Sequence, residues 1–217
     1  MTRIKICGIK EESHALEAAE AGADFIGLVF AASPRQVTPV RAEKIAAALK
    51  KNKASTEVVG VFVNTPATLV KKIAHLCHLD WVQLSGDEPW QYCLELTIPV
   101  VKVIRLSRHH KPEIINADIA YGTRLLSSQK YLFLLDSDIR DKYGGTGRTF
   151  DWNLAKPIAA QHPVIIAGGL TPQNVAESIR TVSPWGVDVS SGVETRGVKD
   201  LAKIKKFIKA VREADDR

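Results

Sequence analysis

The chain contains no run of about 20 apolar residues, which is the length that a helix needs to cross a membrane. Its first residues, MTRIKICGIKEES, hold only a short apolar stretch that charged residues interrupt. They lack the apolar core and the cleavage site of a secretory signal. We therefore expect mature structure from the first residue, a cytoplasmic location and no association with a membrane.

Cysteine is scarce, with Cys7, Cys77 and Cys93 as its three occurrences and no C-x-x-C pair among them. An odd, sparse set of this kind argues against a disulfide framework and a zinc knuckle, and it fits a reducing compartment. His75 and His78 flank Cys77, but they fall at a predicted helix end without a fourth ligand. We predict no metal site.

The chain also lacks low-complexity segments, linkers and repeats of fixed period. Its 217 residues therefore favour one domain, residues 1–217. Apolar residues make up 45% and charged residues 25%, a mixture typical of globular proteins. A domain of this size buries enough surface to be stable without a disulfide or a metal.

Basic residues outnumber acidic ones and give a net charge of +6, which favours an anionic partner such as a phosphorylated substrate or a nucleic acid. Much of the excess lies near the C-terminus, at Lys199, Lys203, Lys205, Lys206, Lys209 and Arg212. These residues alternate with an apolar stripe at helical spacing, and no aromatic-rich basic motif accompanies them. We predict the solvated face of a helix and no nucleic-acid partner. The sequence is compatible with a monomer or a homodimer.

Short β-branched or apolar runs alternate with helical patterns along the whole chain. The predicted strands cover 3–9, 23–30, 57–63, 80–85, 99–106, 130–137, 163–170 and 186–193. The helices between them include one that Thr65 caps with Pro66 in the first turn, and a weak one over 111–122. Such alternation predicts parallel strands joined by right-handed crossovers. An open doubly wound sheet would fit, but eight units in so short a chain favour a single (β/α)₈ TIM barrel.

In such a barrel the active residues lie at the carboxyl ends of the strands. On the first strand Ile4 and Ile6 share one face, so Lys5 and Cys7 should point into the barrel. Cys7 comes at the end of the strand and is a candidate catalytic residue. A lone cysteine is also often only a small buried apolar residue, so the position leaves both interpretations open.

Three further strands end with polar residues on one face. Asp136 follows an apolar run on the sixth strand and is either a cap or a catalytic acid. Gln83 and Ser85 end the fourth strand, and Asp188 and Ser190 end the eighth. Each of these could also be a structural hydrogen-bonding group.

Two glycine-containing loops have the character of anion sites, Gly168-Gly169 after the seventh strand and Ser190-Ser191-Gly192 after the eighth. Glycine lets backbone N–H groups approach a phosphate, and these two loops often bind phosphate in this fold. The glycine-rich loop at 144–148 lacks the spacing of a nucleotide P-loop, and we expect a flap over the barrel mouth. Arg35, after the second strand, could bind a carboxylate through two parallel hydrogen bonds, or be a plain surface residue.

Ordered motifs along nearly the whole chain resemble the phosphoribosylanthranilate isomerase family. They are KICGI (5–9), DFIGLVF (24–30) with SPR (33–35), VGVF (59–62), VQL-x-G (82–86), LLDS (134–137), GGTGRTFDW (144–152), AGGLTPQNV (167–175) and GVDVSSGVE (186–194). The family converts N-(5-phosphoribosyl)anthranilate to 1-(2-carboxyphenylamino)-1-deoxyribulose 5-phosphate, an Amadori rearrangement in tryptophan biosynthesis. It uses no cofactor or metal.

The resemblance implies that Cys7 is the general base, Asp136 the general acid and Arg35 the residue that holds the anthranilate carboxylate. The remaining implied or expected contacts are Gln83, Gly145 and Asp188 to the substrate, and Gly168, Gly169, Ser190, Ser191 and Gly192 to its phosphate. The chemistry requires a lowered thiol pKa, which Lys5 could supply, and a raised carboxyl pKa, which burial could supply.

The chain departs from the family at Ser85, where histidine is common, so the contribution of that histidine is in question here. Two other classes of barrel protein fit parts of this pattern. The histidine-pathway aminosugar isomerase is a similar barrel, but it has aspartate where this chain has Cys7, and its substrate carries two phosphates. A barrel that binds phosphorylated ligands without catalysis is disfavoured by the presence of both Cys7 and Asp136.

Overall fold

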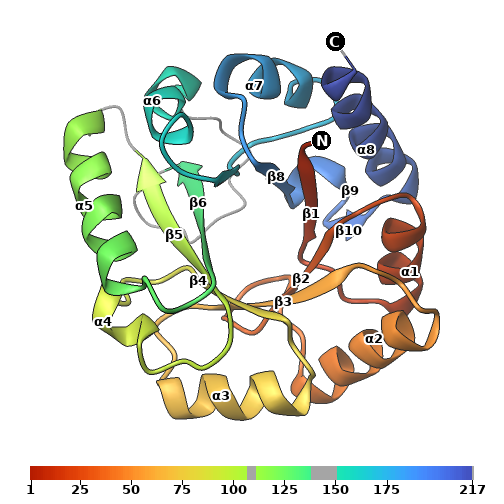
Figure 1. Cartoon of the computed structure of the whole chain (residues 1–217). Helices are drawn as coiled ribbons and strands as arrows, with labels where there is room; N and C mark the ends of the chain where they lie inside the picture. The colour runs from red at the N-terminus through yellow and green to blue at the C-terminus, as the bar shows by residue number, and fades with distance from the viewer. Residues whose placement is uncertain (107–110, 138–150, 217) are drawn as a thin grey trace.

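The computed structural model describes residues 1–106, 111–137 and 151–216. Eight parallel strands form a closed barrel in the order of the chain, and the helices surround it (Figure 1). The strands are β1 (Arg3–Cys7), β2 (Phe25–Val29), β3 (Glu57–Phe62), β4 (Trp81–Leu84), β5 (Val100–Leu106), β6 (Tyr131–Ser137), β7 (Val164–Ile166) and β8 (Gly186–Val189). The prediction of a closed (β/α)₈ barrel, rather than an open sheet, is confirmed.

The helices follow the strands in turn. They are α1 (Glu12–Glu20), α2 (Pro39–Lys51), α3 (Ala67–Leu76), α4 (Trp90–Cys93), α5 (Pro112–Leu125), α6 (Lys156–Ala159), α7 (Val175–Val182) and α8 (Leu201–Asp215). Two 3₁₀ turns, η1 (Trp152–Leu154) and η2 (Ser191–Val193), and a small hairpin, β9 (Glu194–Thr195) with β10 (Val198–Lys199), complete the described elements. Within the described part of the chain, no helix is both long and apolar enough to span a bilayer.

The barrel closes where β1 pairs with β8, in a register that sets Lys5 opposite Asp188. Apolar side chains fill two separate layers. One lies between the strands and the helices and includes Ile4 and Ile6, and the other lies inside the barrel and includes Leu132 and Leu134. The predicted inward and outward faces of β1 and β6 are therefore confirmed.

Helix starts follow the capping chemistry of the sequence in two cases and depart from it in a third. Thr38 accepts a hydrogen bond from the backbone N–H of Arg41 at the start of α2, and Asp200 accepts one from Lys203 at the start of α8. The prediction that Thr65 caps α3 is wrong. Its hydroxyl donates to the Val63 carbonyl oxygen at 3.2 Å, and the helix begins at Ala67.

Several boundaries also differ from the predictions. The helix expected over about 87–96 is a single turn, Trp90–Cys93, whereas the weak helix expected over 111–122 extends to Leu125. Strands β7 and β8 are shorter than predicted because the chain turns into glycine-containing loops. The apolar stripe of α8 is buried as expected, but Lys199 belongs to β10 and is buried instead of lying on a solvated helix face.

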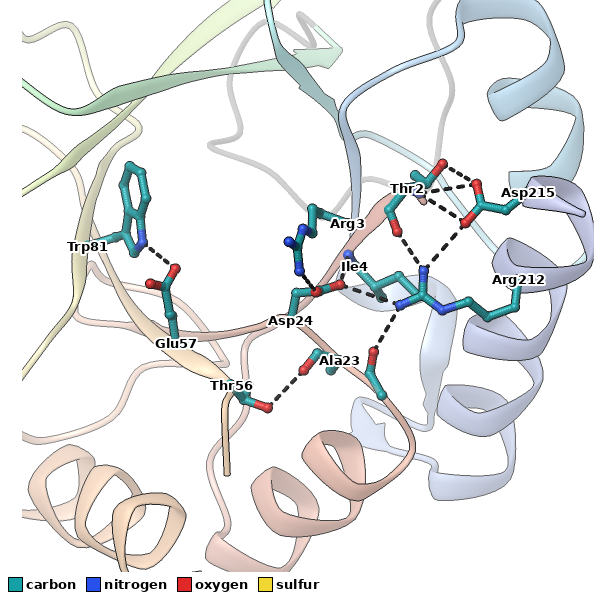
Figure 2. A network of polar contacts seen from close by, with 11 residues as sticks. Thr2, Arg3, Ile4, Ala23, Asp24, Thr56, Glu57, Trp81, Arg212 and Asp215 are labelled. Carbon is teal, nitrogen blue, oxygen red and sulfur yellow. Dashed lines mark hydrogen bonds and ion pairs between the residues drawn. The ribbon is translucent and has the colours of Figure 1, made fainter. Parts of the chain in front are cut away.

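At the opposite end of the barrel from the strand carboxyl ends, a polar network joins the start of β1 to the end of α8 (Figure 2). The Asp24 carboxylate accepts a hydrogen bond from the backbone N–H of Ile4 at 2.8 Å and forms ion pairs with Arg3 and Arg212. Arg212 also donates to the carbonyl oxygen of Thr2 at 2.7 Å. The network therefore fastens the first strand to the last helix.

Replacing Asp24 with alanine should destabilise the fold by about 1–3 kcal/mol, because it removes the acceptor of the Ile4 N–H and the ion pairs with Arg3 and Arg212. For a chain of this size each kcal/mol lowers the Tm by about 2–4 °C, which thermal unfolding followed by circular dichroism would measure. The control is Glu11→Ala, which removes an exposed ion pair with Arg41 and should cost about 0–1 kcal/mol. Equal losses in the two variants would contradict a clamping role for Asp24.

Candidate active site

A cavity of about 450 Å³ opens at the carboxyl ends of the barrel strands. It is lined by most of the residues that the sequence predicted to act together: Cys7, Arg35, Gln83, Asp136, Gly168, Gly169, Asp188, Ser190 and Ser191. They come from β1, β4, β6 and β8 and from the loops that follow β2, β7 and β8. Strand alternation explains the convergence, because every second residue of a barrel strand points inward.

Cys7 ends β1, and its buried thiol lines the cavity above Lys5. Lys5 is 1% exposed and donates a hydrogen bond from Nζ to Asp188 Oδ1 at 3.1 Å. Burial opposes the charge of this ammonium group, but Asp188 and Cys7 outweigh burial and raise the pKa of Lys5. A permanent cation therefore lies beneath the thiol.

The expectation of a lowered thiol pKa is nevertheless wrong. Burial is the largest influence and raises the pKa of Cys7, and the charge of Asp188 acts in the same direction. Lys5 and Lys199 lower it, as the sequence suggested for Lys5, but they do not overcome burial. Lys5 is less effective than expected because it shares its charge with Asp188.

Asp136 follows the inward-facing Leu134 on β6 and lines the cavity opposite the Cys7 strand, with β7 and β8 between them in the ring. Burial raises the pKa of its carboxyl group to about 6, although the backbone N–H of Ser137 donates to Oδ1 at 2.7 Å and opposes the shift. A carboxyl group of this kind keeps its proton near neutral pH far more often than an exposed aspartate does. The predicted raised pKa of this side chain is confirmed.

The backbone of the β7 loop runs directly against Asp136. Gly168 has a φ of +82°, and an added Cβ there would lie 2.6 Å from Asp136 Oδ1, so only glycine fits. Asn174 holds this loop in shape, accepting from the backbone N–H of Thr171 at 2.7 Å and donating to the carbonyl oxygen of Gly169 at 3.0 Å. Asn174 was not singled out from the sequence.

The β8 loop completes the anion site. Ser190 and Ser191 line the cavity, whereas Gly192, which was predicted to do so, lies beside it in η2. A Cβ at Gly192 would overlap the carbonyl oxygen of Leu170, so this glycine lets the β7 and β8 loops touch. The two loops thus bring hydroxyl groups and glycine backbone together at one end of the cavity, as phosphate binding requires.

Arg35 reaches the cavity from the loop after β2, but two nitrogens of its guanidinium group already donate hydrogen bonds to Glu194. Nε and Nη2 donate to the two carboxylate oxygens of Glu194 at 2.7 and 2.8 Å. Burial opposes ionisation of Glu194, but hydrogen bonds from Arg35 and Lys199 lower its pKa to about 2. Arg35 therefore binds a carboxylate of the protein itself through two parallel hydrogen bonds, and its contact with a substrate carboxylate stays a prediction.

Ser85, the residue that departs from the family pattern, contacts a predicted site residue. Gln83 donates from Nε2 to the Ser85 hydroxyl at 3.1 Å, while Gln83 Oε1 is buried and has no hydrogen-bond partner within the described residues. Both side chains line the cavity. Ser85 therefore helps to orient the Gln83 amide group, whose Oε1 atom can accept a hydrogen bond.

Sequence reasoning missed three charged residues of the site. Arg105, the next-to-last residue of β5, lies beside Asp136 in the barrel register, lines the cavity and donates to the carbonyl oxygen of Ser85. Glu194 and Lys199 lie outside the barrel sheet, in the β9–β10 hairpin, where Glu194 contacts Arg35 and Lys199 contacts Ser190. The alternation of Val101, Val103 and Arg105 was a signal for the first, but no strand pattern marked the other two.

The remaining predictions concern the loop at 144–148, the absence of a metal site and the state of the cysteines. Gly145, and with it the expected flap at 144–148, lies outside the described residues. Within the described residues no group of three or more His, Cys, Asp or Glu side chains has the arrangement of a metal site, and Cys7, Cys77 and Cys93 are free thiols.

The fold and the cavity define a (β/α)₈-barrel protein of the enzymatic type, with a thiol and a carboxyl group beside a glycine- and serine-lined anion site. The model of the N-(5'phosphoribosyl)anthranilate (PRA) isomerase family matches residues 4–210. A curated N-(5'-phosphoribosyl)anthranilate isomerase from Dehalococcoides mccartyi is 45% identical over 215 residues, 99% of this chain and 98% of that protein. One from Roseiflexus sp. is 47% identical over 220 residues and covers 99% of both chains.

Solved structures agree with the sequence comparisons. The phosphoribosyl anthranilate isomerase of Thermotoga maritima superposes with a TM-score of 0.82 at 36% identity, covering 98% of this chain and all of that one. A phosphoribosyl anthranilate isomerase in complex with reduced 1-(o-carboxyphenylamino)-1-deoxyribulose 5-phosphate gives a TM-score of 0.79 at 35% identity, with the same coverage. The chain belongs to the phosphoribosylanthranilate isomerase family.

Proposed function

We propose that this single-domain chain isomerises N-(5'-phosphoribosyl)anthranilate to 1-(o-carboxyphenylamino)-1-deoxyribulose 5-phosphate, with Asp136 as general acid and Cys7 as general base. The observation that carries the proposal is that a thiol and a carboxyl group whose pKa is raised to about 6 by burial line one cavity beside an anion site. Family membership supports the same reaction. The buried free thiols support a reducing, cytoplasmic compartment.

The reaction needs one proton donor and one proton acceptor. Asp136 gives its proton to the ring oxygen of the ribose while the anthranilate nitrogen forms a double bond to C1′, which opens the ring. The Cys7 thiolate then takes the proton from C2′, and the resulting enolamine tautomerises to the ketone. One proton leaves Asp136 and one arrives at Cys7, so the rearrangement requires no oxidant or reductant.

The shape and charge of the cavity fit the two ends of this substrate. The Gly168-Gly169 and Ser190-Ser191 loops can hold the phosphate at one end. Beside this anion site, Arg35 supplies a cation for the carboxylate, and the apolar side chain of Phe30 lines the cavity wall and can contact an aromatic ring. Gln83 Oε1 is an acceptor for a sugar hydroxyl or for the anthranilate N–H.

The activity can be measured directly, because phosphoribosylanthranilate fluoresces and the reaction consumes it. Purified protein should cause a rapid decay of this fluorescence, and the double variant with Cys7→Ser and Asp136→Asn should not. The two-phosphate aminosugar of the histidine pathway serves as the competing substrate. Turnover of that compound in place of phosphoribosylanthranilate, or tight binding of phosphoribosylanthranilate without product, would overturn the proposal.

A further inference from the structure

The hairpin that follows the anion site places two opposite charges next to each other. In the β9–β10 hairpin, Glu194 pairs directly with Lys199, and the turn between them uses positive φ values at Arg196 and Gly197. The side chains of Glu194 and Lys199 are 7% and 3% exposed. Two buried charges on a short hairpin outside the barrel sheet require partners, and those partners lie at the cavity.

Glu194 lies between two cations. Its Oε1 accepts from Arg35 Nε at 2.7 Å and from Lys199 Nζ at 2.7 Å, and its Oε2 accepts from Arg35 Nη2 at 2.8 Å. A carboxylate that engages a guanidinium through two parallel bonds fixes the plane of that group. Within the described residues Arg35 Nη1 makes no hydrogen bond, so this nitrogen of the guanidinium group can donate to a ligand in the cavity.

Lys199 connects the same cluster to the anion site. Its Nζ donates to the carbonyl oxygen of Ser190 at 2.8 Å, in the loop that lines the phosphate end of the cavity. The side chain of Arg35 packs across Gly8, the residue after Cys7, so closely that an added Cβ at Gly8 would lie 2.5 Å from Arg35 Cδ. The hairpin thus fixes the separation between Ser190 and Arg35.

We propose that Glu194 is a positioning residue, which holds the Arg35 guanidinium in the orientation that receives the substrate carboxylate while Lys199 anchors the hairpin to the phosphate loop. The inference rests on the proposed function, because it takes the carboxylate of that substrate as the ligand of Arg35. It goes beyond that function because it gives the β9–β10 hairpin, which lies outside the barrel, a role in substrate selection. The hairpin would select molecules that carry a carboxylate and a phosphate at a set distance from each other.

The test is a double-mutant cycle between Glu194→Gln and Arg35→Met, measured as the KM for phosphoribosylanthranilate and the Kd of the reduced 1-(o-carboxyphenylamino)-1-deoxyribulose 5-phosphate. Glutamine keeps the size of Glu194 but not its charge. Glu194→Gln should raise both constants about tenfold and change kcat less. In the Arg35→Met background it should change neither, because the residue through which it acts is gone. Glu17→Gln, at an exposed ion pair with Lys205, is the matched control and should change nothing.

The outcomes are distinct. Additive effects, or an equal rise in the inhibition constant of inorganic phosphate, would show a general structural role and overturn the proposal. Tighter binding by Glu194→Gln would also overturn it, because Glu194 would then compete with the ligand. If Glu194→Gln does not fold, Glu194→Asp, which keeps the charge, should give a smaller rise that Arg35→Met again abolishes. Absence of turnover by the unmodified protein refutes the proposed activity, and the Kd cycle, which needs no turnover, still tests Glu194.

Discussion

Replacing Asp136 with asparagine should lower kcat for phosphoribosylanthranilate by about 10²–10⁴-fold, the usual contribution of a general acid. Asparagine has the same shape, and its oxygen can still accept the 2.7 Å hydrogen bond from the backbone N–H of Ser137. The variant therefore removes the acidic proton while leaving the packing against Gly168 in place. Ring opening, which needs that proton, becomes the slow step.

The measurement is steady-state fluorescence decay, with circular dichroism to establish that the variant folds. Asp118→Asn is the matched control, because Asp118 accepts a hydrogen bond from Trp90 Nε1 and does not line the cavity. Its kcat should stay near that of the unmodified protein. A folded Asp136→Asn variant with near-normal turnover would contradict the assignment of Asp136 as the acid.

The sequence placed Cys7 and Asp136 correctly at the mouth of the barrel, because strand alternation decides which side chains point inward. An inward-facing residue at the carboxyl end of a strand reaches the cavity whatever the loops do, so Cys7 and Asp136 could be placed from the strands alone. Arg105 obeys the same rule and was available from the pattern of β5. The barrel itself was predictable for a related reason, since eight alternating units leave few ways to pair parallel strands.

Residues placed by loops could not be found in this way. Glu194 and Lys199 meet Arg35 through a hairpin of two short strands, and such a pairing between residues 159 apart leaves no periodic trace in the sequence. The prediction that Thr65 caps α3 is wrong for a local reason, because its hydroxyl group hydrogen-bonds to the carbonyl oxygen of Val63 instead. Hydrogen-bond competition of this kind is decided by backbone geometry that residue types do not encode.

The pKa of Cys7 departs from the sequence-based expectation because two effects of opposite sign act on it. The sequence alone predicts the charge of Lys5 one inward position below the thiol. It does not predict how deeply the thiol is buried or that Asp188 lies close to it. Burial exceeds the effect of Lys5, which is itself paired with Asp188. The sign of such a balance depends on tertiary packing.

Replacing Cys7 with serine should likewise lower kcat about 10²–10⁴-fold, because a hydroxyl is a far weaker acid than a thiol and yields almost none of the anion that removes the C2′ proton. Cys77→Ser is the control, since the Cys77 sulfur is buried outside the cavity and bonds to the carbonyl oxygen of Pro39, which a hydroxyl can also do. A folded Cys7→Ser variant that turned over normally would exclude Cys7 as the base.

The pH dependence of kcat/KM separates the two groups. The active form has Asp136 protonated and Cys7 ionised, yet burial raises the pKa of Asp136 to about 6 and raises that of Cys7 above its usual value. Below pH 6 the rate should rise with pH as the thiolate fraction grows. Above pH 6 that gain is cancelled by loss of the Asp136 proton, so the profile should be level until the thiol itself titrates and then fall.

Each of the two variants should keep only the part of this pH profile that comes from the group it retains. With asparagine at 136, the rise should continue through pH 6 without a break, because only the thiol still titrates. With serine at 7, the rate should be level at low pH and fall above about 6, the pKa of Asp136. The substrate phosphate also titrates near pH 6, but it does so in every variant, so a difference between the profiles belongs to the protein. A break near pH 6 that persists unchanged in the Asp136→Asn variant would assign that titration to another group and leave Asp136 without its role as the acid.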